Sequence, residues 1–281
     1  MKATLKSLLD RAEKEQSAVG CFTVPNMEIL MAAIEAAEEM ETPIAIQIAE
    51  GRIEYSPIDY IGPMMVSAAE NAGVDVCVHL DHGLSKEMIK KALAMGFSSV
   101  MFDGSRSELE ENIRHTQEIV EIAGKYGASV EAEIGSIGGK EATENQDAVL
   151  YSSIEDVKRF SDECRVDALA VAIGNAHGHY HGAPKLNMKL LKNLSETTAF
   201  PLVLHGGSGI SGEGFRECIR NGIRKINIAT SILDAYGTGI RTHVESTQEN
   251  SYYRLNEMGR KYVKEEVKKH IRIFNNKEAL Q

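Results

Sequence analysis

Three short motifs of the chain each place a histidine beside glycine after a run of apolar residues. They are Asp81-His82-Gly83, His177-Gly178 and His205-Gly206. In a parallel α/β barrel the carboxyl ends of the strands meet on one face, where catalytic side chains lie. Three imidazoles on that face give a zinc ion three protein ligands and leave one coordination position open, as in catalytic zinc sites. The pattern therefore predicts a metal centre formed by His82, His177 and His205.

The choice among the nine histidines depends on where each lies relative to an expected strand end. His79 lies deeper in its strand than Asp81, and we interpret it as structural. His177 is preferred to His179 and His181 because it comes first after the strand end, which places the other two on the outgoing loop. One histidine in an apolar segment is usually a core residue, but three at strand ends favour a shared ligand.

Acidic residues near these motifs could transfer protons. Asp81 adjoins His82, and Glu141 lies in the polar, glycine-hinged loop 135–147, which we interpret as a lid rather than a disordered excursion. A metal that polarises a carbonyl, together with a carboxylate that removes the neighbouring C–H proton, stabilises an enediolate. Three further acids near strand ends are expected either to support the metal ligands or to lie at the surface; they are Asp103, Glu131 and Glu133.

Two glycine- or threonine-containing turns predict a phosphate site. The segment 206–209 (Gly-Gly-Ser-Gly) follows the strand that carries His205, and 227–231 (Asn-Ile-Ala-Thr-Ser) closes the last strand and begins a helix. Backbone N–H groups in such turns bind phosphate, and barrels often place that site after strands 7 and 8. A metal, a phosphate site and a mobile base together indicate carbon–carbon bond chemistry on a phosphorylated ketone.

The elements that must position these residues alternate along the chain as strands and helices. Such alternation is typical of parallel crossovers, and eight units in about 250 residues is the size of a (β/α)8 barrel. The expected strands are 19–24, 43–48, 74–80, 98–103, 128–133, 167–173, 201–204 and 225–228. The expected helices are 5–14, 27–40, 57–72, 86–95, 109–126, 154–164, 189–194, 212–221 and one from 231.

We therefore predict an α/β fold: a single TIM-barrel domain over residues 1–281, of which 251–281 form an extra C-terminal helical extension with one buried stripe. A doubly wound open sheet is the alternative, but no G-x-G-x-x-G motif follows the first strand.

Composition limits the classes of partner. No apolar run approaches the roughly 20 residues of a membrane span, and the four cysteines lack C-x-x-C spacing, so we expect reduced thiols in a cytoplasmic protein with no membrane partner. A net charge of −10 argues against nucleic-acid binding. An anionic small molecule remains compatible, because a metal and helix N-termini can make one cleft locally positive.

Five motifs, in this order over almost the whole chain, carry a resemblance to a known family. They are His-Leu-Asp-His-Gly, Glu-Ala-Glu-Ile-Gly-x-x-Gly-Gly, Gly-x-x-His-Gly-x-Tyr, Leu-His-Gly-Gly-Ser-Gly and Lys-Ile-Asn-Ile-x-Thr. The chain resembles the class II, zinc-dependent ketose-bisphosphate aldolases of the fructose and tagatose type. The resemblance implies a barrel, commonly a homodimer or homotetramer, that reversibly cleaves a ketose bisphosphate to dihydroxyacetone phosphate and an aldehyde such as glyceraldehyde 3-phosphate.

The resemblance also implies roles for single residues. His82, His177 and His205 would hold Zn2+ or another divalent metal, while Asp103 and Glu133 would belong to an alternative, buried metal position. Asp81 would exchange the proton of the hydroxyl at the cleaved bond, and Glu141 would handle the C3 proton of dihydroxyacetone phosphate. The expected substrate- and phosphate-binding residues are Asn26, Gly178, Gly206, Ser208, Asn227 and Thr230. Some members of the family also bind Na+ or K+ beside the phosphate.

Departures from the family pattern concern the aldehyde half of the substrate. Ala229 stands where fructose-bisphosphate enzymes usually have Asp, Leu233 where many members have a basic residue, and Ala49 where serine is common. These changes favour a specificity other than strict fructose 1,6-bisphosphate, although Arg52, Arg106 or a neighbouring subunit could bind a second phosphate. An aldolase for a ketose 1-phosphate with a non-phosphorylated aldehyde half is the alternative.

Three other functions are weighed against an aldolase that depends on a metal. A Schiff-base aldolase would use a lysine nucleophile, for which Lys225 is the nearest candidate, but Lys225 lies at the start of its expected strand, away from the mouth. A zinc hydrolase would need neither the paired phosphate turns nor a glutamate on a lid. A non-catalytic sugar-phosphate-binding barrel is disfavoured because all the metal ligands and both acids are present.

Overall fold

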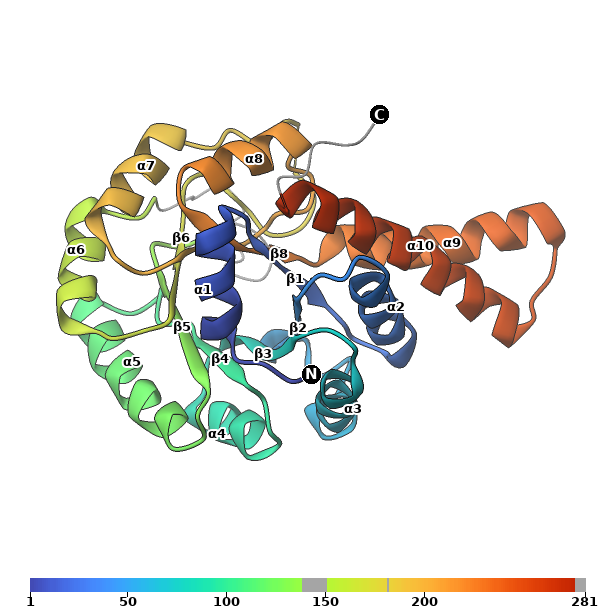
Figure 1. Ribbon diagram of the computed structural model, residues 1–281, viewed down its shortest axis with the longest axis horizontal. Coiled ribbons are helices and arrows are strands. Elements are labelled where there is room, and N and C mark those ends of the chain that lie inside the picture. Colours follow the sequence, from blue (N-terminus) through green and yellow to red (C-terminus); the bar gives the residue numbers. More distant parts are fainter. Residues whose placement is uncertain (138–150, 181, 276–281) are drawn as a thin grey trace.

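The computed structural model describes residues 1–137, 151–180 and 182–275. In these ranges eight parallel strands close into a barrel, each paired with the next along the chain and β8 with β1 (Figure 1). The strands are β1 (Val19–Thr23), β2 (Ile44–Ala49), β3 (Val76–Gly83), β4 (Ser99–Phe102), β5 (Ser129–Ile134), β6 (Ala168–Val171), β7 (Leu202–Leu204) and β8 (Ile223–Ile228). The predicted (β/α)8 barrel is confirmed.

Helices surround the barrel and follow the strands in turn (Figure 1). They are α1 (Leu5–Glu15), α2 (Met27–Glu39), the short 3-10 helix η1 (Glu50–Arg52), α3 (Ile58–Asn71), α4 (Lys86–Ala94), α5 (Leu109–Gly124), α6 (Ile154–Glu163), α7 (Met188–Thr197), α8 (Gly212–Arg220), α9 (Thr230–Thr247) and α10 (Tyr252–Phe274). The expected extra C-terminal helix is α10, which packs against α9 and α2, and the α9–α10 pair projects beyond the barrel on one side (Figure 1).

Helix α1 closes the amino-terminal end of the barrel, which we call the floor. Its first N–H groups are capped by Thr4, whose side chain accepts a hydrogen bond from the Ser7 N–H. Leu5, Leu8 and Leu9 recur at helical spacing and pack in one apolar cluster with barrel-interior residues such as Cys21, Ala45, Cys77 and Met101. The opposite end, which we call the mouth, is left to the loops that follow the strands.

Several strand boundaries differ from the sequence-based expectation, and two of these differences bear on the site. β3 does not end at Leu80 but continues through Gly83, with a shift in its pairing to β4 between Leu80 and Gly83. β8 begins at Ile223, so Lys225 is its third residue and lies fully buried rather than at the strand's start. All four cysteines are free and buried, as predicted for reduced core thiols.

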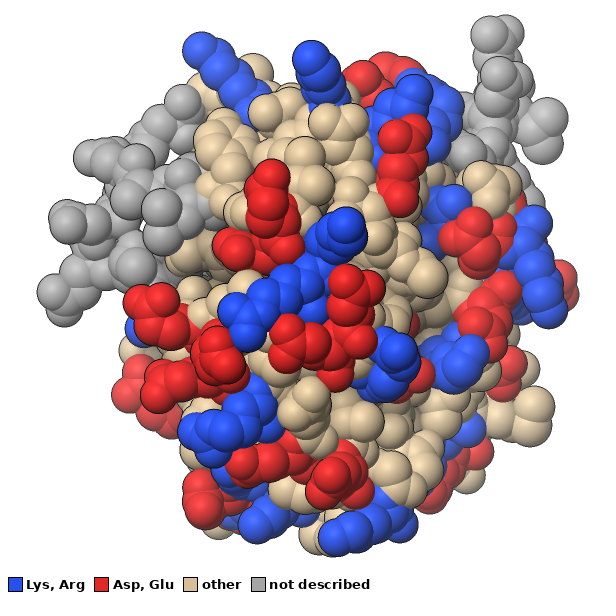
Figure 2. Space-filling model, turned by 90° about the vertical axis from the view of Figure 1, so that its left-hand side faces the viewer, with Lys and Arg blue, Asp and Glu red and all other residues tan. Residues whose placement is uncertain are grey.

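The outer surface mixes charges of both signs. On the face seen in Figure 2, basic and acidic side chains alternate rather than gathering into an area of one sign. Ion pairs between neighbouring helices or within one helix include Arg159 with Glu110 and Glu163, and Arg114 with Glu118. Among the helices of the described ranges, none has both the length and the apolar composition that crossing a bilayer would need.

Candidate active site

The backbone of β3 explains how Asp81 and His82, which are consecutive in the chain, both lie at the mouth. In a regular strand neighbouring side chains point to opposite faces. His82 has a φ of 42°, in the left-handed region that non-glycine residues rarely adopt, and the pairing to β4 shifts at this point. Next to it, a Cβ on Gly83 would lie 2.4 Å from the carbonyl oxygen of Met101, so β4 can approach only a glycine.

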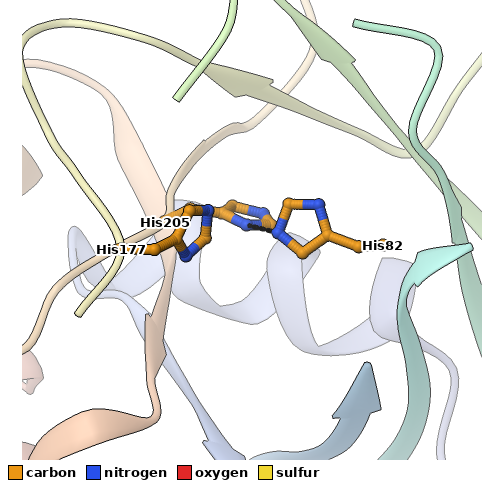
Figure 3. A group of neighbouring side chains, drawn as sticks. All are labelled: His82, His177 and His205. Atoms are coloured by element: carbon orange, nitrogen blue, oxygen red, sulfur yellow. Dashed lines mark hydrogen bonds between the residues drawn. The ribbon is translucent and has the colours of Figure 1, made fainter. Parts of the chain in front are cut away.

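Three imidazole rings converge from β3 and from the loops after β6 and β7 (Figure 3). The ring centroids lie 5.0 Å apart for His82 and His177, 4.7 Å for His82 and His205, and 5.9 Å for His177 and His205. One ring nitrogen from each residue lies within 4.8 Å of the others. The three histidines chosen from the sequence therefore do come together at the mouth.

The orientation of two of these rings fits a cation better than it fits any neutral arrangement. His82 Nε2 and His205 Nδ1 face each other at 3.0 Å. Their other ring nitrogens lie 2.8 Å from carboxylates, His82 Nδ1 from Asp103 and His205 Nε2 from Glu131, and so act as donors. Two lone pairs would then meet head-on, which requires a proton or a metal ion between them. Zinc is a cation that would satisfy both lone pairs, because imidazole nitrogens are among its usual ligands.

The two loops that carry His177 and His205 are joined by hydrogen bonds. Asn175 is fully buried; its side chain accepts from the Ile173 N–H and donates to the His205 carbonyl at 3.0 Å. The Tyr180 hydroxyl accepts from the Ala176 N–H and donates to the Gly206 carbonyl at 2.8 Å. These contacts fix the β6 and β7 loops relative to each other.

A second group of possible metal ligands shares His82. It combines His82 with Asp103 and Glu133, the two acids expected at an alternative metal position. Glu133 Oε2 is buried and has no hydrogen-bond partner among the described residues, and burial followed by the nearby Asp103 raises its pKa well above the usual value. Burial opposes a charge on His82, but Asp81, Asp103 and Glu133 outweigh it and raise its pKa to about 10. In the absence of a metal, this ring would carry a proton.

Asp81 is held beside the histidines by two side-chain amides. Gln47 Nε2 donates to one carboxylate oxygen at 3.0 Å, and Asn227 Nδ2 donates to the other at 3.1 Å. The carboxylate is nearly buried, with 4% of the residue exposed. Both donors come from barrel strands, β2 and β8, so this carboxylate is oriented by the rigid part of the fold.

Below the three histidines, a charged pair occupies the barrel interior. Glu131 Oε1 accepts from His205 Nε2, and Glu131 Oε2 lies 2.9 Å from Lys225 Nζ. All three side chains are fully buried. Burial, followed by the charge on His82, lowers the pKa of His205 well below its usual value, so this ring stays neutral.

Beside the histidines lie the ends of β7 and β8, where phosphate binding is expected from the sequence. The Ser208 hydroxyl accepts from the Ser231 N–H at 3.1 Å, which holds the glycine-rich turn against the first turn of α9. Ala229, the N-cap residue of α9, makes no side-chain capping bond. The first N–H groups of that helix, beginning at Thr230, are therefore not fully satisfied by a cap and suit an anion.

Other predicted residues fall in different places. Glu141 and His181 lie outside the described residues, as does most of the expected lid. Asn26 caps α2 by accepting from the Ile29 N–H at 2.9 Å. The side chain of His179 is 76% exposed and lies 3.5 Å from Asp234, whereas His79 is buried and lies 2.9 Å from the Ser99 hydroxyl, consistent with its structural interpretation.

Several residues that organise the site were not predicted to do so from the sequence, where Lys225 was considered only as a lysine nucleophile. Gln47 and Lys225 orient Asp81 and Glu131, and Asn175 and Tyr180 join the loops. A signal was present for Gln47, because it is the one polar residue in the otherwise apolar strand β2. Glu131, for which a surface position was one interpretation, is instead fully buried. The sequence contained no comparable signal for Asn175.

Comparisons with known proteins agree with this geometry. A family model described as class-II fructose-bisphosphate aldolase matches residues 3–279. The chain is 36% identical over 276 residues to the fructose-bisphosphate aldolase of Staphylococcus aureus, with 96% of each chain covered. It is 37% identical over 280 residues to the 6-phospho-5-dehydro-2-deoxy-D-gluconate aldolase of Halalkalibacterium halodurans, with 96% of this chain and 95% of that one covered.

A solved structure gives the same result. The crystal structure of the YdjI aldolase from Escherichia coli K12 matches with a TM-score of 0.87 and 36% identity, covering 98% of this chain and 97% of that one. The family model spans nearly the whole chain, and the relatives match over nearly their whole length. The chain therefore belongs to the class-II fructose-bisphosphate aldolase family and is an aldolase, a lyase.

Proposed function

We propose that this aldolase reversibly cleaves a ketose 1,6-bisphosphate of the fructose or tagatose type to dihydroxyacetone phosphate and an aldehyde such as glyceraldehyde 3-phosphate. The observation that carries the proposal is the face-to-face pair of ring nitrogens of His82 and His205, with His177 beside them and Asp81 adjacent in the chain. This arrangement supports a metal-assisted reaction at the mouth of the barrel.

The three histidines would hold Zn2+. A nitrogen-only set of three ligands suits zinc and leaves a position for substrate. When bound, the ion would polarise the ketone carbonyl and stabilise the negative charge that develops on it. The group of His82, Asp103 and Glu133 is the candidate for an alternative position of the same ion.

Asp81 would exchange the proton of the hydroxyl at the cleaved bond. Its carboxylate is held on both oxygens by Gln47 and Asn227, which fixes its direction without neutralising it. Removal of the hydroxyl proton leads to breakage of the adjacent C–C bond, and the bonding electrons remain on the ketone half as an enediolate. Glu141 would then protonate C3 of that half, which completes dihydroxyacetone phosphate.

The phosphate of the ketone half would lie between the β7 turn and the start of α9. Gly206, Ser208 and Thr230 line this region, and Gly178 has a φ of 88° in the facing loop. Asn227 and Asn26 are further candidates for substrate contact. A Na+ or K+ ion beside the phosphate would offset part of its charge.

The identity of the aldehyde half is the least constrained part of the proposal. Ala229 and Leu233 contribute no charge at the start of α9, where Leu233 is 43% exposed. The Halalkalibacterium halodurans relative is named for a substrate with a single phospho group. Both observations support, as a second candidate, a ketose 1-phosphate whose aldehyde half carries no phosphate.

We also propose that the enzyme works as a homodimer or homotetramer. In that assembly a neighbouring subunit, or Arg52 and Arg106 of the same chain, would bind a second phosphate. The four free, buried cysteines suit a reducing compartment, which supports a cytoplasmic location.

An aldehyde screen with dihydroxyacetone phosphate as the fixed donor tests the proposal. We expect C–C bond formation that stops when a chelator removes the metal and returns when Zn2+ is added. Comparing kcat/KM for fructose and tagatose bisphosphates and for a ketose 1-phosphate then identifies the aldehyde half. No condensation with any aldehyde, or hydrolysis in its place, would contradict the aldolase proposal.

A Schiff-base mechanism is separable in the same preparation. Lys225 is fully buried and paired with Glu131, and nearby anionic groups outweigh burial and raise its pKa above the usual value. A charged amine is not a nucleophile. Borohydride treatment in the presence of substrate should therefore leave the protein mass unchanged.

A further inference from the structure

The carboxylate of Glu131 lies in the barrel interior and faces side chains from β3, from β8 and from the residue that follows β7. Oε1 accepts from Nε2 of His205 at 2.8 Å, and Oε2 lies 2.9 Å from Nζ of Lys225 and 3.8 Å from Nε2 of His79. Neither Glu131 nor its three partners has measurable exposure to solvent. The partners of this carboxylate are therefore side chains of the barrel interior.

Lys225 extends the same network to the proton-transfer carboxylate. Its Nζ donates to Asn227 Oδ1 at 2.7 Å, and Asn227 Nδ2 donates to Asp81 Oδ1 at 3.1 Å. Because the ammonium group can only donate, it turns the amide oxygen of Asn227 towards itself and the amide NH2 towards Asp81. The network thus joins His205 to Asp81 from below.

An ion pair at this depth is a weak source of stability, because the cost of removing both charges from water offsets most of their attraction. It does, however, decide which nitrogen of His205 carries the proton. An ionised Glu131 accepts from Nε2–H and leaves the lone pair on Nδ1, the nitrogen that faces His82. Lys225 Nζ, 2.9 Å from the other carboxylate oxygen, is the counter-charge that pairs this carboxylate in the interior and holds it against His205.

We propose that Glu131 and Lys225 form a positioning pair for the metal centre: the pair fixes the tautomer of His205 and, through Asn227, the direction of Asp81. The pair would touch neither metal nor substrate. This inference rests on the metal-dependent function proposed above. Partners of this kind that hold a metal-binding histidine typically change metal affinity by about 10–100-fold when removed.

The test compares zinc affinity in the wild-type chain and in the double variant Glu131→Gln/Lys225→Met. Both substitutions keep the shape of the side chain and remove both charges together, so neither is left buried and unpaired. Zinc transfer from the loaded, full-length protein to a competing chromophoric chelator gives the dissociation constant. We expect the double variant to fold and to bind zinc about 10–100-fold more weakly.

The second readout is the tautomer of His205, which would not change if the Glu131–Lys225 pair only stabilised the fold. In ¹⁵N-labelled wild-type protein, the His205 ring should show a protonated Nε2 in both the zinc-loaded and the chelator-treated form. A His205→Asn variant assigns its signals. In the double variant the chelator-treated protein should show a mixture of both tautomers.

A matched control is Glu13→Gln at the floor, which likewise removes the carboxylate from a buried cation. Glu13 pairs with Arg224, whose side chain is 5% exposed. We expect this control to lower stability without changing the zinc affinity or the His205 signals. If the double variant does not fold, Glu131→Asp replaces it. This substitution keeps the charge but shortens the side chain, and it should also weaken zinc binding.

The positioning role would be overturned if the Glu131 variants bound zinc as tightly as the wild-type protein and showed the same His205 tautomer. The same result would leave the proposed function standing. A wild-type protein that takes up no zinc would instead overturn the proposed function, and with it the basis of this inference.

Discussion

At the floor of the barrel, Leu5, Leu8 and Leu9 of a regular, capped helix meet apolar side chains of the strands. At the mouth, the backbone turns through a left-handed residue, His82, and buried carboxylates face imidazole rings. The two ends are built from the same strands, only a few residues apart. The floor is held mainly by apolar packing, whereas the mouth brings a left-handed strand residue and buried charged groups together at one place.

The two ends of the barrel therefore contribute differently to stability and to function. Each fully buried leucine at the floor contributes about 1.5–3 kcal/mol of hydrophobic free energy. A non-glycine residue held in the left-handed region costs on the order of 1–2 kcal/mol. The floor therefore stabilises a fold whose mouth is partly strained, and substitutions at the two ends should affect different measurements.

The largest expected effect is that of His205→Ala at the mouth. Removing one of the three proposed metal ligands should reduce zinc content to background and abolish cleavage, a loss greater than the roughly 10–100-fold expected for a residue that only supports a ligand. Metal analysis and the aldolase assay measure the two effects, and circular dichroism checks the fold. An active, zinc-loaded His205→Ala protein would place the metal elsewhere.

Next is Glu141→Ala, in the loop expected to close over the mouth. We expect zinc content and fold to be retained while proton exchange at C3 of dihydroxyacetone phosphate slows by about 10²–10⁴, the usual contribution of a positioned acid–base group. Tritium or deuterium exchange measures that step alone. Glu144→Ala, three residues further along the loop, is the control and should exchange at nearly the wild-type rate.

Leu9→Ala tests the floor. Leu9 is 1% exposed, and its truncation should lower the free energy of unfolding by about 2–5 kcal/mol. Zinc content and kcat/KM at 25 °C should stay close to wild type, because the cluster lies at the opposite end of the strands. Urea unfolding measures the loss, with the exposed Lys14→Ala of the same helix expected within about 0.5 kcal/mol of wild type. A large fall in kcat/KM for Leu9→Ala would show that the two ends are coupled.

Gly206→Ala is expected to combine a smaller loss of stability with a loss of activity. Gly206 has a φ of 63°, and a Cβ there would lie 2.2 Å from the Ala176 carbonyl oxygen. The strain should cost about 1–3 kcal/mol, and moving His205 by about 1 Å should lower kcat on the order of 10²-fold. Gly124→Ala, at the end of α5 where a Cβ meets no atom within 4 Å, is the control and should retain full activity.

The contrast between the ends also explains how far the sequence could be interpreted. The strands are buried on both faces and therefore appear as apolar runs, and the barrel followed from their number and spacing. His82, His177 and His205 could be selected because each follows such a run. The end of β3 could not be predicted, because the left-handed turn at His82 is a departure from strand geometry that the surrounding contacts impose.

The interior network was less accessible still. Lys225 seemed to stand at a strand start because β8 begins two residues earlier than its apolar pattern suggests. Glu131 could equally have faced the surface, since one residue of register decides on which side of a strand a side chain points. Which polar residue meets which depends on pairing across five strands, and no local pattern contains that information.

The smallest expected effect concerns a histidine outside the mouth. His270 on α10 is 4% exposed and packs among Phe22, Phe215 and Phe274, and its Nδ1 donates to the Glu266 carbonyl. Burial lowers its pKa below 6.5, whereas carboxylates raise that of His82. The unfolded chain therefore binds a proton below pH 6.5 that the folded chain does not, so this residue reduces stability as the pH falls below that value.

His270→Asn keeps a donor near the Nδ1 position but cannot take up a proton. We expect the fall in unfolding free energy between pH 7.5 and pH 5.5 to be smaller in this variant than in wild type, by at most about 1.4 kcal/mol. Urea unfolding of the zinc-loaded protein at both pH values measures it. Val267→Ala, on the same buried face of α10, should lower stability equally at the two pH values. If His270→Asn also lowers the unfolding free energy equally at the two pH values, His270 does not contribute to the pH dependence of stability.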